Sequence, residues 1–269
     1  MRAFTLVELM VSIALATAVG VLLLSVFTGS IGIWERAVGR METQREAQAI
    51  FASAAEDLSQ SGPVVSSHPW LFCEVIPASS INLGGSGPVT SESSVRLTFL
   101  TRARGEDDAS QGVNALTYQI AYTDPRPGSS TPIYGLYRIP TTTRQFAGNV
   151  RASIPLDTPT PSNPSQFVAG NFLARQVIGF HAKFLIESDA GDLSTIAPEP
   201  GKAVSATDTG VWLGTTRAGR RVAGIEVQCV IVSAKSMNRL STVATTLRDR
   251  LLMKDERPYG AFIPMPTSL

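Results

Sequence analysis

The chain begins Met1-Arg2-Ala3-Phe4-Thr5-Leu6-Val7-Glu8-Leu9-Met10-Val11-Ser12, and the apolar run that follows decides the fold. After Glu8 that run continues without a charge from Leu9 to Trp34. About 26 residues in a helix extend roughly 39 Å, which is enough to cross a bilayer with some tilt. A carboxylate in such a segment costs about 2.5–3.5 kcal/mol on insertion scales. We therefore expect a membrane span over about 9–34 and a functional role for Glu8.

Two simpler interpretations of this start compete. A cleaved secretory signal has a charged start, a short apolar stretch and a small-x-small site, for which Arg2 and Ala16-Thr17-Ala18 would serve. However, Glu8 would then lie inside the apolar stretch, and strong hydrophobicity resumes over 19–27. A plain membrane anchor explains the length of the run but not its carboxylate.

The segment from Ala3 to Leu9 resembles the class III signal of type IV pilins and type II secretion pseudopilins. In that family a prepilin peptidase cuts just before a Phe, the new amine is methylated, and a Glu stands at the fifth mature position. Counted from Phe4, the fifth residue is Glu8, and Ala3 stands where the family usually has Gly. The resemblance implies a leader peptide of residues 1–3, cleavage between Ala3 and Phe4, N-methylation of Phe4, and a role for Glu8 in assembly.

Composition agrees with an anchored protein that carries one further domain. The chain has 269 residues and a formal net charge of +1. This balance argues against nucleic-acid binding, which uses a basic face. Removal of the anchor leaves about two hundred residues, which is enough for one domain with its own core. Beyond the span, no apolar segment approaches about 18 residues, so we expect a single crossing of the lipid bilayer.

The orientation in the membrane has two conflicting indicators. Arg2 precedes the span, while Arg36, Arg40 and Arg45 follow it, and by the positive-inside count this places the head in the cytoplasm. The resemblance implies the opposite, with the N-terminus cytoplasmic, the span in the cytoplasmic (inner) membrane and the head periplasmic. We expect the second arrangement.

The helix is expected to continue beyond the membrane as one pilin-like helix over 4–62. No Pro occurs between Trp34 and Gln60. Apolar residues recur there at three- and four-residue spacing and form a stripe suited to packing on the head. These are Met41, Ala47, Ile50, Phe51, Ala54, Ala55 and Leu58. Gly62 and Pro63 supply the stop.

Over 63–269 the pattern changes to short strands, which predicts an α+β head with an antiparallel sheet. The predicted strands are 70–76, 95–100, 115–122, 133–139, 176–186 and 224–233. Helical period returns over 236–252, which predicts an additional C-terminal helix ended by Pro258. Long loops rich in Ser, Thr, Pro and Gly are predicted at about 78–92, 151–167 and 187–220.

The order of these segments is similar to that of the minor pseudopilin J family of type II secretion systems. Leu136-Tyr137-Arg138 and the strand containing Phe180 and Phe184 carry the resemblance. It covers roughly 4–232 and does not extend to 236–252, and minor type IV pilins of the W type share much of the pattern. It implies other pilin or pseudopilin subunits as partners.

Enzymatic chemistry finds little support in the sequence. His68 and His181 are far apart and lack metal-ligand spacing. Glu106-Asp107-Asp108 does not continue as a calcium loop, and Gly84-Gly85-Ser86-Gly87 lacks the Lys and helix of a phosphate site. We expect no catalytic residues, no metal and no cofactor.

Cys73 and Cys229 both lie in predicted strands. Two buried free thiols are one interpretation. The other is a single disulfide, since bridges persist outside the cytoplasm.

Three functional classes follow: an assembly subunit, an anchored enzyme, and a membrane-anchored adhesin or receptor. The sequence favours the first, a structural subunit at or near the tip of a secretion or pilus filament. Glu8 would compensate the charged amine of Phe4 in its own or an adjacent subunit.

Overall fold

The structure, a computed structural model of the whole chain, describes residues 6–62, 69–77, 81, 94–101, 114–125, 132–141, 167–233 and 257–265. Two compact units are distinguished, Met1–Gln44 and Arg45–Leu269. The first holds the N-terminal part of helix α1, and the second holds the remainder of α1 and all the strands.

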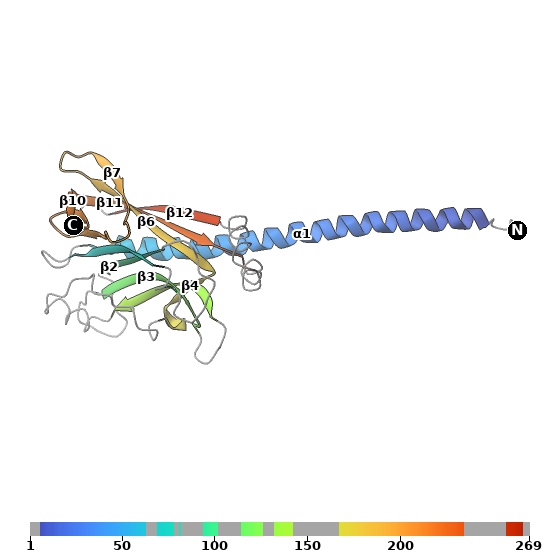
Figure 1. Cartoon of the computed structure of the whole chain (residues 1–269), viewed down its shortest axis with the longest axis horizontal. Helices are drawn as coiled ribbons and strands as arrows, with labels where there is room; N and C mark the ends of the chain where they lie inside the picture. The colour runs from blue at the N-terminus through green and yellow to red at the C-terminus, as the bar shows by residue number, and fades with distance from the viewer. Residues whose placement is uncertain are drawn as a thin grey trace. The chain divides into compact units, whose positions relative to one another are not determined.

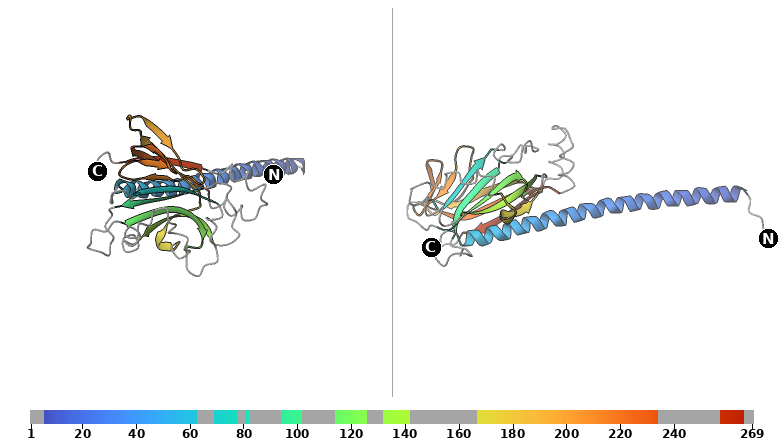
Figure 2. Two further views of the ribbon diagram at one scale, coloured as in Figure 1. Left: turned by 60° about the vertical axis from the view of Figure 1, so that its left-hand side comes forward. Right: turned by 90° about the horizontal axis from the view of Figure 1, so that it is seen from below.

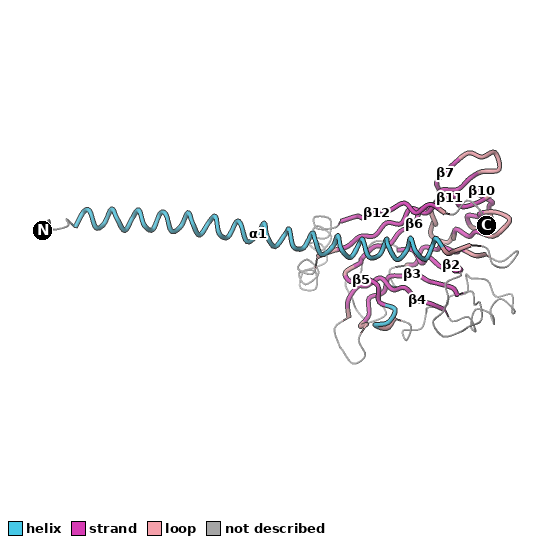
Figure 3. Tube along the Cα trace, turned by 180° about the vertical axis from the view of Figure 1, so that it is seen from behind, coloured by secondary structure: helices cyan, strands magenta, loops and turns pink. Residues whose placement is uncertain are grey.

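Helix α1 extends from Leu6 to Ser59 without interruption, as the absence of Pro predicts. It is the long helix labelled α1 in Figure 3. Its end differs from the predicted glycine cap. The Ser61 hydroxyl and N–H both donate to the Leu58 carbonyl, and the Gly62 N–H donates to Leu100 at 3.3 Å. The chain therefore passes from helix to sheet by pairing with a strand.

The larger sheet has eight antiparallel strands in the order β10-β9-β8-β1-β2-β3-β4-β5. Figure 1 shows β2, β3 and β4 side by side. The strands are β1 (Leu71–Ile76), β2 (Ser94–Thr101), β3 (Asn114–Thr123), β4 (Ile133–Thr141), β5 (Phe172–Arg175), β8 (Val204–Ala206), β9 (Val211–Leu213) and β10 (Thr216–Gly219). A short 3-10 helix, η2 (Ala169–Asn171), precedes β5.

The smaller sheet has four antiparallel strands in the order β12-β11-β6-β7. They are β6 (Val177–Glu187), β7 (Leu193–Ile196), β11 (Arg221–Ile231) and β12 (Arg257–Pro264). A hydrogen bond of 2.9 Å from the Phe180 N–H to the Ser94 hydroxyl links the two sheets.

One apolar core joins the C-terminal turns of α1 to both sheets, and Figure 2 shows those turns alongside the strands. Ile50 and Leu58 from the helix are fully buried, as are Phe99 from the larger sheet and Phe184 from the smaller one. The predicted helical stripe is confirmed from Ala47 to Leu58, whereas Met41 is exposed. The prediction that every second residue of β11 faces the core is confirmed too. Its apolar residues Ile225, Val227, Cys229 and Ile231 are all buried.

The predicted α+β class is therefore confirmed, and the six predicted strands all occur. Two predictions about the head were wrong. The segment 187–220 contains β7 to β10, whose three or four residues each are too short to show a period. The segment 257–264 is a strand, although Pro258 and Pro264 suggested a terminating tail. The predicted helix over 236–252 lies outside the described residues.

Candidate functional site

Glu8 lies in the first turn of α1, where the helix dipole and the unpaired backbone N–H groups favour a negative charge. It is the single charged residue between Leu6 and Trp34. Ala3 and Phe4, the predicted cleavage and methylation site, lie outside the described residues.

The apolar part of α1 is exposed rather than packed. Between Leu6 and Trp34 every residue is exposed except the half-buried Gly32. The helix is long and apolar enough to cross a membrane, and its most apolar stretch has no buried residue. An apolar surface of this size needs an apolar environment, and a single membrane crossing provides one.

Four hydroxyl groups along this surface form hydrogen bonds within the helix. Ser12 donates to the Glu8 carbonyl at 2.7 Å, and Ser30 donates to the Val26 carbonyl at 2.8 Å. Thr17 and Thr28 bond in the same way to carbonyls three and four residues back. Because hydrocarbon offers no partner for a hydroxyl, this back-bonding removes a cost of several kcal/mol per group.

A partly buried ion pair joins the end of α1 to the larger sheet. Arg138 on β4 donates from Nε and Nη2 to the two carboxylate oxygens of Asp57, at 2.6 and 2.8 Å. Asp57 is only 6% exposed. This two-bond geometry is the strongest that a guanidinium makes with a carboxylate. The bonds to Asp57 raise the pKa of Arg138 above its ordinary value.

Tyr118 on β3 completes this cluster, which comprises Asp57, Arg138, Tyr118 and Ser53. Its hydroxyl donates to Asp57 at 2.5 Å and lies 3.2 Å from the Ser53 hydroxyl. Its ring is stacked between Phe99 and Phe180, with centroids 6.0 and 6.3 Å away. Burial, and then the Asp57 charge, raise the pKa of Tyr118. The helix end is therefore held to the core by charge, hydrogen bonds and packing together.

The Asp57–Arg138 pair was not predicted from the sequence, although the position of Asp57 in the sequence gives an indication of it. Asp57 occurs on the apolar stripe, three residues after Ala54 and one before Leu58. A charge on an apolar face indicates a buried partner. The partner stands 81 residues later in the chain, and only the pairing of β3 with β4 brings it near.

Cys73 on β1 and Cys229 on β11 are buried, free thiols that belong to different sheets, so no disulfide joins them in this structure. Burial, and then the nearby Glu74 carboxylate, raise the pKa of Cys73. Burial alone raises the pKa of Cys229 to about 12. Both side chains behave as small apolar groups in the core.

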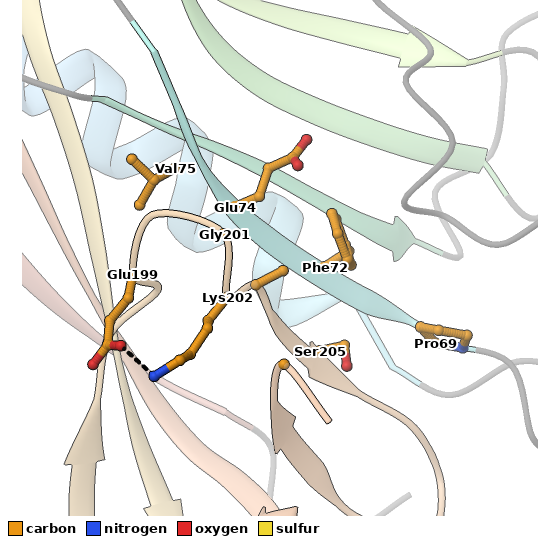
Figure 4. A pocket seen from close by; sticks show the side chains of 10 residues that line it. Pro69, Phe72, Glu74, Val75, Glu199, Gly201, Lys202 and Ser205 are labelled. Atoms are coloured by element: carbon orange, nitrogen blue, oxygen red, sulfur yellow. Dashed lines mark hydrogen bonds and ion pairs between the residues drawn. The ribbon is translucent and has the colours of Figure 1, made fainter. Parts of the chain in front are cut away.

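An open hollow of about 540 Å³ lies beside β1 and β8 (Figure 4). Phe72 and Ser205 contribute to its wall. Its acidic and basic side chains are already paired. Arg96 Nε donates to Glu74 at 2.7 Å, and Lys202 donates to Glu199 at 3.0 Å. Among the described residues that line the hollow, the charged side chains Glu74, Glu199 and Lys202 each have a partner of opposite charge.

The remaining polar candidates are dispersed. His181 lies on β6 opposite Gln228, while His68, 84–87 and 106–108 lie outside the described residues. Within the part of the chain that the structure describes, no three His, Cys, Asp or Glu side chains are grouped to hold a metal ion.

Comparisons with protein-family models, with curated proteins and with solved structures found no match to this chain.

Proposed function

We propose that this chain is a minor pseudopilin or pilin-like subunit of a type II secretion or type IV pilus filament, placed near the tip. It is anchored in the cytoplasmic membrane, with its N-terminus cytoplasmic and its head periplasmic. The observation that carries the proposal is one long helix with an exposed apolar surface and a single carboxylate, Glu8, in its first turn.

The charge on Glu8 is what separates this proposal from a plain anchor. A carboxylate in hydrocarbon is costly, and a nearby cation offsets part of that cost. Cleavage after Ala3 creates such a cation, the amine of Phe4. In a filament, Glu8 of one subunit and the Phe4 amine of the same or a neighbouring subunit would compensate each other.

The anchorage of α1 in the head supports a structural role. Within Arg45–Leu269 the helix is held by the partly buried Asp57–Arg138 pair and by a second ion pair, Arg175 to Glu46 at 3.3 Å. Apolar packing of Ile50, Ala54 and Leu58 adds to these contacts. These contacts hold the C-terminal turns of α1 within the head.

Processing is the direct test. The full chain should be co-expressed with a prepilin peptidase and with a catalytically inactive form of that peptidase as the control. Intact mass and N-terminal analysis should show loss of residues 1–3 and a methylated Phe4 only with the active enzyme. Ala3→Gly should be cut at least as fast.

A cut after Ala18 would identify a secretory signal and overturn the proposal. No cut at all would leave a plain anchor, which favours the alternative of a membrane-anchored adhesin or receptor.

A further inference from the structure

The two edges of the smaller sheet are built differently. Among the described strands, β12 and β7 form these edges. In an edge strand every second residue directs its N–H and C=O away from the sheet, where another strand can pair with them. The hydrogen bonds of the structure identify these residues on each edge.

The β12 edge is closed by proline. The Met265 N–H donates inward to the Ala223 carbonyl at 3.1 Å, so the alternate residues of β12 face outward. These are Pro258, Gly260, Phe262 and Pro264. Two of the four lack an N–H, and proline on an edge strand is a common protection against pairing.

The β7 edge is open with respect to the described strands, since β6 is the only one of them that pairs with β7. The Ser188 N–H donates to the Asp192 carbonyl at 2.8 Å, which places Asp192 and Ser194 inward and Leu193 and Thr195 outward. The strand Leu-Ser-Thr-Ile contains no proline and no charge, and its pairing with β6 has no bulge. Leu193 is 60% exposed, and Figure 1 shows β7 at the margin of the sheet.

We propose that the β7 edge binds an extended segment of a neighbouring subunit, which adds a fifth strand to the smaller sheet. The turn at Ser188–Asp192 and the proline at 198 limit the ladder to Leu193–Ile196. We expect the bound segment to be uncharged where it pairs with β7. On one face of the sheet it would cover Leu193, and on the other face it would lie next to the half-buried Ile196. A basic residue at the end of the bound segment would pair with the carboxylate of Asp192, which is exposed beside β7.

Membrane anchorage makes so short a ladder effective. Two residue pairs bind weakly in free solution, because association costs translational and rotational freedom. Subunits anchored in one membrane have already lost much of that freedom, which raises their effective concentration. In this respect the inference rests on the proposed function.

The test uses the full chain in native membranes. A photo-cross-linking side chain is placed at position 193, and at position 260 on the closed edge as the reference. Thr195→Pro removes the outward N–H of β7, while Thr195→Val keeps that N–H and the branched shape and serves as the matched control. Thr195→Lys keeps the N–H but adds an edge charge, and it provides a second disrupting variant if the proline variant fails to fold.

The expected product is a cross-link from 193 to one segment of another membrane-anchored subunit, with a yield on the order of tenfold above that at 260. Thr195→Pro and Thr195→Lys should each lower this yield on the order of tenfold, and Thr195→Val should leave it nearly unchanged.

Four results would overturn the inference: no product at 193, equal yields at 193 and 260, a product made of two copies of this chain, or equal loss in the Val and Pro variants. The proposed function is judged separately. If the peptidase never cuts before Phe4 while the cross-link still depends on the Thr195 N–H, the proposed function fails. The inference that the β7 edge binds another strand then still stands.

Discussion

Asp57, in the last turns of α1, and Arg138, near the end of β4, face each other with two hydrogen bonds of 2.6 and 2.8 Å. The carboxylate is almost fully enclosed, while the guanidinium side chain is about one-third exposed, at 36%. The pair therefore connects the helix to the sheet at the border between core and solvent.

Removing the carboxylate should destabilise the head. Asp57→Ala leaves Arg138 and the Tyr118 hydroxyl without their acceptor, and we expect a loss of about 2–3 kcal/mol, discounted for the partial exposure of Arg138. Thermal or urea unfolding of the full chain in detergent measures it. Asp189→Ala breaks the exposed pair with Arg217 and is the matched control, with an expected cost below about 1 kcal/mol. Equal effects of the two variants would contradict a special role for Asp57.

Stability should decline in alkaline solution. Burial raises the pKa of Cys229 from 9.0 to about 12, so between these values the unfolded chain loses a proton that the folded chain retains. The free energy of unfolding therefore falls as pH rises above about 9, and this contribution is fully present only below that pH. Tyr118, whose pKa is also raised, adds to the decline above about 10. Cys229→Val should flatten the profile measured from pH 8 to 11, and an unchanged slope would show that the thiol does not titrate differently in the two states.

Thiol labelling should distinguish folded from unfolded protein. With both thiols buried and protonated, iodoacetamide at pH 8 should label neither Cys73 nor Cys229 in the native chain. Both should be labelled after unfolding without reductant, as mass analysis of the peptides would show. Absence of labelling in the unfolded, unreduced chain would reveal a disulfide between them.

Two strand glycines lie beneath aromatic rings and should respond differently to a methyl group. A Cβ at Gly135 would collide with Phe172, which packs against Tyr137 with centroids 5.4 Å apart. A Cβ at Gly224 would collide with Phe262, whose side chain is 54% exposed. We expect Gly135→Ala to cost about 1–3 kcal/mol, since its ring is confined, and Gly224→Ala clearly less. The reverse order in unfolding experiments would mean that Phe172 moves more freely than Phe262.

Glu8→Val should separate membrane insertion from assembly. Without the carboxylate, insertion should be unchanged or improved, because a costly charge is removed. If Glu8 compensates the Phe4 amine as proposed, incorporation with partner subunits should weaken by a few kcal/mol per assembled contact. Co-purification with partner subunits measures this, with Met10→Val as the control in the same apolar segment. Unchanged co-purification would count against the pairing.

The local features of this protein could be predicted from its sequence because they rest on short-range patterns. An uncharged apolar run specifies a membrane-length helix, three- and four-residue spacing specifies the stripe from Ala47 to Leu58, and alternation specifies strands such as β3 and β11. The class α+β follows from the order of these segments. Glu8 could be selected because one carboxylate in an apolar run is conspicuous.

Tertiary structure alone decided the contacts between residues distant in the chain. The Asp57–Arg138 pair and the separation of Cys73 and Cys229 into different sheets depend on strand order, which pairing between distant segments determines. The strands β7 to β10 are too short to carry a period and form because neighbouring strands supply their hydrogen bonds. Whether a proline closes an edge depends on which of its neighbours face inward, and that alternation is set by the register with the adjacent strand.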